Sequence, residues 1–209
     1  MTTLSRRSAV LTLVVALGSS HLAGCAALLV GGAVVGGTMV VTDRRSAATQ
    51  LEDQLIESKA ASRVREIVGD RGKVTATSYN RLVLLTGDVV TESDKGAVEQ
   101  GVARLDSVRS VVNELAVAGS ASLSARSNDL LLSAKVKASI VDTKGLYANS
   151  IKVVTERGVV FLLGRVTEQE ATQAANVARG VTGVVKVVRV FDILTETELA
   201  ELQPKAAPK

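Results

Sequence analysis

An internal repeat restricts the possible fold more than any other feature of this sequence. Residues 81–89 (RLVLLTGDV) align with residues 158–166 (GVVFLLGRV) at an offset of 77. A second block, residues 107–112, aligns with residues 183–188 at an offset of 76. The chain must therefore fold into two similar units of about 70 residues each, rather than into one large core.

Apolar spacing, together with glycine and capping residues, predicts the order αββαβ in both copies. In the first copy we expect a helix with core positions Leu51, Leu55, Ala60, Val64 and Val68 that ends at Gly69. The other elements of this copy are strands 73–79 and 81–86, the second stopped by Gly87, helix 91–105 and strand 108–117. In the second copy we expect helix 129–141, strands 151–157 and 159–163, helix 167–179 and strand 184–193.

The predicted fold class is α+β, with domains at 47–118 and 124–195, each a small three-stranded sheet packed on two helices. Residues 123–128 are interpreted either as a flexible linker or as part of a packed interface. The tail, 196–209, begins with helix-forming residues, and we expect it to be poorly ordered beyond Leu202. The patterns leave the relative orientation of the two domains open.

The N-terminus carries the pattern of an export signal. A short basic start that contains Arg6 and Arg7 precedes an apolar run from Ala9 to Gly18, which is too short to span a bilayer. Leu22-Ala23-Gly24-Cys25 then resembles the lipobox of bacterial lipoproteins. We therefore predict a signal peptide at 1–24, a lipid on the thiol of Cys25, and a Gly-rich apolar tether within 25–46. A membrane-spanning helix at 26–41 is the alternative interpretation of the tether.

Cleavage before Cys25 would leave a mature chain without histidine, because His21 is the only one, and with its only thiol occupied by lipid. Zinc sites and Ser-His or Cys-His catalytic groups need those side chains, so we expect no catalytic residues, no metal and no cofactor beyond the covalent lipid. Glu168 and Glu170 form a possible acid-base pair, but acidic residues also favour a helix N-terminus, which is the simpler interpretation. We likewise expect no small-molecule substrate and, since the sequence has no basic-aromatic clusters, no nucleic acid.

The αββαβ order, the Leu-x-Gly-x-Val motif at 85–89 and 162–166, and Gly-Val-x-x-Val at 183–187 resemble the BON domain. Ser107 replaces the glycine in the first copy. Two such domains behind a lipobox, with Asp43-Arg44-Arg45-Ser46 after the tether, are similar to the dual-BON outer-membrane lipoproteins of Gram-negative bacteria, of the division- and outer-membrane-stress-associated lipid-binding type. This resemblance implies a non-enzymatic protein held in the outer membrane and facing the periplasm, whose second domain binds anionic phospholipid and which supports envelope integrity.

Charge and hydrophobicity differ between the two copies. Residues 44–118 hold 11 basic and 11 acidic residues, whereas residues 119–195 hold 10 and 6, a net charge of +4. An alignment of the first helices at offset 72, which matches Arg63-Val64 with Lys135-Val136, sets Leu130 and Leu131 against Ser58 and Lys59.

The candidate lipid-binding residues are therefore the apolar positions and flanking cations Leu130, Leu131, Ala134, Lys135 and Lys137. Two alternatives stay open: these leucines pack against the other domain, or the protein is an interaction module that docks an envelope protein and touches lipid only incidentally.

Overall fold

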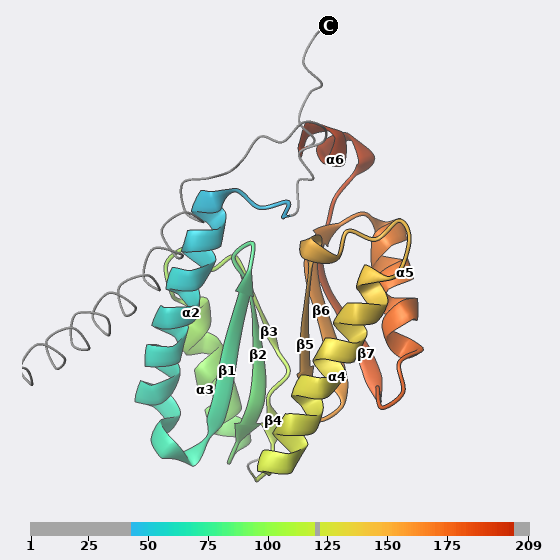
Figure 1. Cartoon of the computed structure of the whole chain (residues 1–209). Helices are drawn as coiled ribbons and strands as arrows, with labels where there is room; N and C mark the ends of the chain where they lie inside the picture. The colour runs from blue at the N-terminus through green and yellow to red at the C-terminus, as the bar shows by residue number, and fades with distance from the viewer. Residues whose placement is uncertain (1–42, 120–121, 203–209) are drawn as a thin grey trace, which may run out of the picture. The chain divides into compact units, whose positions relative to one another are not determined.

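The computed structural model describes residues 43–119 and 122–202, which contain two αββαβ units and a short final helix (Figure 1). The first domain comprises α2 (Ala47–Val68), β1 (Lys73–Tyr79), β2 (Leu82–Val89), α3 (Glu92–Ala103), β3 (Ser110–Asn113) and β4 (Ala116–Val117). The second comprises α4 (Leu123–Val141), β5 (Ile151–Glu156), β6 (Val159–Val166), α5 (Glu168–Arg179) and β7 (Lys186–Ile193), followed by α6 (Glu196–Leu202). The predicted fold class is confirmed, whereas the predictions for Cys25 and the rest of 1–42 lie outside the described residues.

Both sheets have the same topology, with one long strand at the centre. In the first domain β1 pairs antiparallel with β2, while β3 and β4 pair with β2 in parallel. In the second domain β5 pairs antiparallel with β6, and β7 pairs with β6 in parallel along its whole length. The strand that we expected at 108–117 is thus divided into two short pieces in the first domain, with Glu114 and Leu115 between them, although the backbone N–H of Glu114 still donates to the carbonyl oxygen of Leu85 in β2 at 2.9 Å.

A glycine that we expected to end a strand lies inside β2 instead, since this strand continues past Gly87 to Val89. A Cβ atom at Gly87 would lie 2.0 Å from the carbonyl oxygen of Lys73 on the paired strand. In the second domain a Cβ at Gly164 would lie 2.3 Å from the carbonyl oxygen of Ser150. The repeated Leu-x-Gly-x-Val motif therefore marks a close approach of two strands rather than a strand end.

The helix α4 begins six residues earlier than the sequence predicted. Ser122 is its N-cap, and its hydroxyl accepts a hydrogen bond from the backbone N–H of Ala125 at 3.2 Å. Residues 123–128 are consequently the first turns of a helix rather than a flexible linker. In α2, Leu51 and Leu55 are exposed, and Ile56 occupies the core position at this level of the helix.

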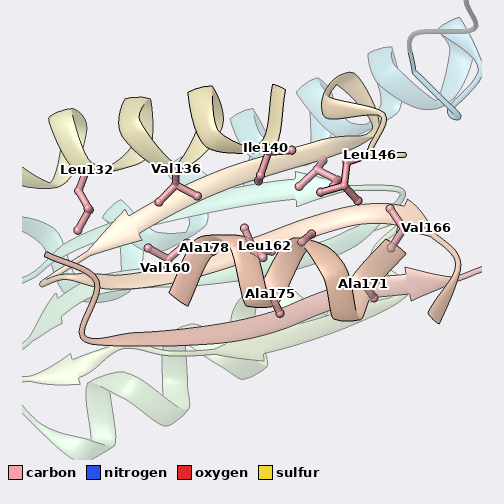
Figure 2. Close-up of a cluster of buried hydrophobic side chains, with 12 residues drawn as sticks. Leu132, Val136, Ile140, Leu146, Val160, Leu162, Val166, Ala171, Ala175 and Ala178 are labelled. Carbon is pink, nitrogen blue, oxygen red and sulfur yellow. The ribbon is translucent and has the colours of Figure 1, made fainter. Parts of the chain in front are cut away.

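Each domain has its own core between one face of its sheet and its two helices. In the second domain, three α4 side chains (Leu132, Val136 and Ile140) face the central strand β6 and the alanines of α5 (Figure 2). The first domain uses Ile56, Ala60, Val64 and Val68 of α2 in the same way. The small alanines of α5 allow that helix to lie close to the sheet.

A third core joins the two domains, which belong to one compact unit of the chain. It consists of side chains from the sheet faces that the helices do not cover: Tyr79, Leu84, Phe161, Leu163 and Val190. Polar contacts at its edges link Asn80 and Arg109 to Asp192, at 2.7 and 3.0 Å. The two sheets therefore pack against each other, which fixes an orientation that the sequence patterns left open.

The turn before β3 contains a serine in a backbone conformation that glycine adopts at lower cost. Ser107 has a φ of 68°, and Gly183, its counterpart at offset 76, has a φ of 103°. A residue with a Cβ atom is strained at positive φ.

We expect Ser107→Gly to raise the free energy of unfolding by about 0.5–1 kcal/mol, because relief of this strain exceeds the entropy that glycine gains in the unfolded chain. Urea denaturation measures the change. Gly183→Ala is the matched control and should lower the free energy of unfolding by about 1 kcal/mol. Equal stability of Ser107→Gly and the parent would contradict the strain at this turn.

Candidate functional site

A buried aspartate in the first helix of each domain holds the β-hairpin turn that follows. Asp53 and Asp129 each accept two backbone N–H groups, at 2.8–2.9 Å, from the turn residues Asn80, Arg81, Arg157 and Gly158. All four turn residues have positive φ, as a two-residue type I′ turn requires. These bonds fix the position of the helix along the hairpin, so the two aspartates are structurally equivalent.

This equivalence corrects the alignment of the first helices, whose offset is 76 and not 72. Ile56, Ala60 and Val64 occupy the positions of Leu132, Val136 and Ile140. Apolar positions that recur every four residues look alike after a slip of one helical turn, which is why the apolar pattern alone gave the wrong offset. Leu131 therefore corresponds to Leu55, and Leu130 to Gln54.

An apolar stripe runs along the outer side of α4. At 100° per residue its members fall within an arc of about 100°. We call these residues the α4 face: Leu123, Ser127, Leu130, Leu131, Ala134, Ala138 and Val141. The exposed fractions of its four large side chains are 80% for Leu123, 73% for Leu130, 62% for Leu131 and 60% for Val141. Exposure on this scale over one helix is unusual for a surface that only faces water.

The equivalent stripe of α2 is more polar, so the two domains still differ after the correction. Its residues are Ala47, Leu51, Gln54, Leu55, Ser58, Ser62 and Arg65. Leu51 and Leu55 are exposed there, but Gln54 and Arg65 replace Leu130 and Val141. The continuous apolar stripe therefore belongs to the second domain alone.

The two lysines that the sequence grouped together have different surroundings. Lys135 is exposed at the margin of the α4 face. Lys137 is half-buried, and its Nζ donates hydrogen bonds to the carbonyl oxygens of Ala148 and, at 2.7 Å, Ile151. Burial lowers the pKa of Lys137. Lys135 is thus free to contact an anion outside the protein. The ammonium group of Lys137 instead binds carbonyl groups at the start of β5.

A further apolar side chain that the sequence analysis missed is exposed near the first half of α4. Val185 is 78% exposed and lies against the hairpin turn, where a Cβ at Gly158 would come within 2.9 Å of it. Beside this turn a shallow pocket of about 460 Å³ opens, lined among others by Leu131, Lys135 and Thr182. We expected Val185 inside the strand 184–193, whereas it lies just before β7, which begins at Lys186.

No helix in 43–119 or 122–202 is long and apolar enough to cross a membrane. The same residues contain no cluster of three or more acidic, histidine or cysteine side chains that could hold a metal ion. Glu168 and Glu170 lie in the first turn of α5, as the simpler interpretation of this pair predicted, and Glu170 is the third residue of the helix and forms a capping box with Thr167. Exposed Glu168 pairs with Arg189 at 2.8 Å, so the two carboxylates have separate partners.

The sequence matches the family description "BON domain" twice, at 53–119 and 128–195. It is 36% identical over 185 residues to "Outer membrane lipoprotein DolP" of Haemophilus influenzae, covering 87% of this chain and 95% of that protein. It is 30% identical to the "21 kDa hemolysin" of Actinobacillus pleuropneumoniae, covering 72% of this chain and 78% of that protein. The C-terminal domain of CdsD from Chlamydia trachomatis, a solved structure, matches 64% of this chain and 96% of its own at 12% identity and a TM-score of 0.28, which is too distant to carry an inference.

The different surroundings of the two lysines lead to opposite expectations for one substitution. Lys137→Met should lower the free energy of unfolding by about 1–3 kcal/mol, because two partly buried carbonyl groups lose their donor. Lys135→Met should change it by less than about 0.5 kcal/mol. Chemical denaturation of both variants checks this, and equal effects would show that the contacts of Lys137 do not contribute to stability.

Proposed function

The chain belongs to the BON domain family, and on this premise we propose that it is a non-enzymatic outer-membrane lipoprotein whose second domain binds anionic phospholipid. Lipid on Cys25 holds the protein in the membrane, and the domains face the periplasm and support envelope integrity. The name of the Haemophilus influenzae relative supports the location, since that protein is an outer membrane lipoprotein. The lipobox-like sequence at 22–25 supports the anchor.

The α4 face is the observation that carries the lipid-binding proposal. Leucine and valine side chains on one side of a helix can enter the boundary between head groups and acyl chains, where they leave water without needing a polar partner. Lys135 at the margin can reach the phosphate groups while its methylene chain stays on the apolar surface. Val185 enlarges the surface that could insert. The face contains no aromatic residue, so its insertion is shallow.

Electrostatic attraction favours the second domain over the first. Residues 119–195 have a net charge of +4, while residues 44–118 are neutral by count. Each basic side chain near an anionic membrane contributes about 1 kcal/mol, an effect that falls off within a Debye length. The contact is therefore reversible and salt-dependent, unlike the anchor, in which several acyl chains each contribute about 0.8 kcal/mol per buried CH₂.

The chain provides a matched pair of substitutions to test this. In a soluble form that begins at Asp43, Leu131→Glu should weaken binding to phosphatidylglycerol vesicles at least tenfold, because a carboxylate would face the anionic surface. Leu55→Glu, at the equivalent and similarly exposed position of α2, should leave binding within twofold. Vesicle sedimentation at low and high salt measures both effects.

Equal binding of the two variants, or binding that salt does not weaken, would refute lipid recognition by the α4 face. If the unmodified soluble chain does not bind vesicles at all but the Leu131→Glu variant still impairs envelope integrity in cells, the face docks a protein instead.

The anchor is tested separately. Metabolic labelling with palmitate should label the full chain and should be lost in Cys25→Ser, because the thiol is the acceptor. Cell fractionation should then find the variant outside the outer-membrane fraction. Retention of Cys25→Ser in the membrane after a high-salt wash would instead support a membrane helix at 26–41.

A further inference from the structure

The segment that follows the tether contacts both domains. Arg44 is 6% exposed, and its guanidinium donates to both carboxylate oxygens of Glu170 in the second domain, at 2.6 and 2.7 Å. It also donates to the carbonyl oxygen of Arg165 at 2.9 Å, and it lies 5.3 Å from the ring centre of Tyr147. In return Arg165 donates to the carbonyl oxygen of Arg44 at 3.2 Å. A residue that precedes the first domain is thus bound by the second.

The neighbouring Arg45 holds the same segment to the first domain. Its guanidinium lies 3.9 Å from the ring centre of Tyr79 and donates to Asp53 at 2.8 Å. The hydroxyl of Tyr79 in turn donates to the carbonyl oxygen of Ser150 in the second domain at 3.3 Å. Burial and the Asp43 carboxylate raise the pKa of Tyr79 to about 12, so this hydroxyl keeps its proton at neutral pH. Of the two adjacent arginines, Arg44 therefore binds the second domain and Arg45 binds the first.

The site that receives Arg44 is built by the local structure of the second domain. Glu170 is fixed by its capping box, in which its Oε2 accepts the backbone N–H of Thr167 at 2.9 Å. Burial alone would raise the pKa of Glu170, but the bonds from Arg44 and Thr167 outweigh it and hold the pKa below its ordinary value. Two parallel N–H donors to one carboxylate form the geometry that suits a guanidinium better than an ammonium group.

We propose that Glu170, the carbonyl group of Arg165 and the ring of Tyr147 form a guanidinium-binding site on the second domain, occupied by Arg44 of the same chain, that attaches the membrane tether to this domain. Without the site, the tether would connect to the second domain only through the first. With the site occupied, Arg44 lies beside Tyr147, which is six residues after the end of α4. The segment between Cys25 and Arg44 is then attached directly to the domain that bears the α4 face. The role of the anchor rests on the proposed function, but occupation of the site does not.

Trypsin provides a direct test, because no lysine or arginine lies between Cys25 and Arg44. When the lipidated full chain is bound to vesicles, trypsin can release the intact pair of domains only by cleaving after Arg44 or Arg45. Glu170→Gln keeps the capping box, since glutamine also caps from this position, but removes the charge that binds Arg44. We expect it to accelerate release of a fragment that begins at Arg45 or Ser46 at least tenfold. Glu168→Gln, two residues away and exposed, is the matched control and should release it at the parent rate.

A charge reversal separates a specific site from a general loss of structure. Arg44→Glu should lower Tm by about 5–10 °C, because Glu170 would face a second carboxylate without its partner. Glu170→Arg also removes the carboxylate that caps Thr167, so the two charge reversals are compared in a double-mutant cycle: the double variant should be more stable than the sum of the two single losses predicts. Additive losses, or release of the fragment from Glu170→Gln at the same rate as from Glu168→Gln, would overturn the site.

The effect on the anchor is measured on phosphatidylglycerol vesicles with a polarity-sensitive fluorophore at Ser127→Cys, the one free thiol of the lipidated chain. Glu170→Gln should reduce the spectral shift of this fluorophore at least twofold, since the anchor no longer starts from the second domain. An unchanged shift despite faster release would overturn the role in attaching the tether. No shift in the parent chain would refute lipid binding by α4, while the trypsin result would still decide whether the guanidinium site exists.

Discussion

The contact between the two sheets determines most of the remaining structure. Each sheet carries apolar side chains on both faces, and its two helices cover only one of them. The other faces meet in the core that contains Leu84 and Phe161, where water is excluded from both at once. This contact sets the relative position of the domains. It thereby also sets how far the site on the second domain that binds Arg44 lies from the side chains of the first domain that bind Arg45. It also leaves the outer surfaces of the helices exposed, and there the two domains can differ.

The two domains share the features that form the fold and differ on the outer side of their first helices. The aspartate, hairpin turn and close-approach glycine recur in both copies, because each is needed to form the domain. The outer side of the first helix has no such constraint, and there α2 presents Gln54 and Arg65 where α4 presents Leu130 and Val141. In our proposal the first domain supplies a sheet face and a partner for Arg45, while the second supplies the lipid contact and the site for Arg44.

The sequence predicted the fold class and most strands, because alternation, capping residues and the repeat all agree. It placed the start of α4 wrongly, since several serines before Asp129 could each cap a helix, and Ser122 does so. It also misaligned the first helices, because two offsets that differ by one turn give similar apolar patterns, whereas the hydrogen bonds of Asp53 and Asp129 distinguish them. The unbroken apolar runs at 82–85 and 159–163 are typical of strands buried on both sides, a signal that our sequence analysis did not use. No local pattern could have paired Arg44 with Glu170, which are 126 residues apart.

The stacking of the sheets has a consequence for how far such a repeat can extend. In solenoid proteins every unit offers a fresh surface to the next, so units can be added without limit. Within the described residues of this chain, each sheet uses one face for its helices and the other for its neighbour, so the tandem is closed at two, much as a twofold dimer is closed. A third copy would find no sheet face to join and would have to attach through helices or loops. The geometry thus limits the number of sheets that can share this core to two.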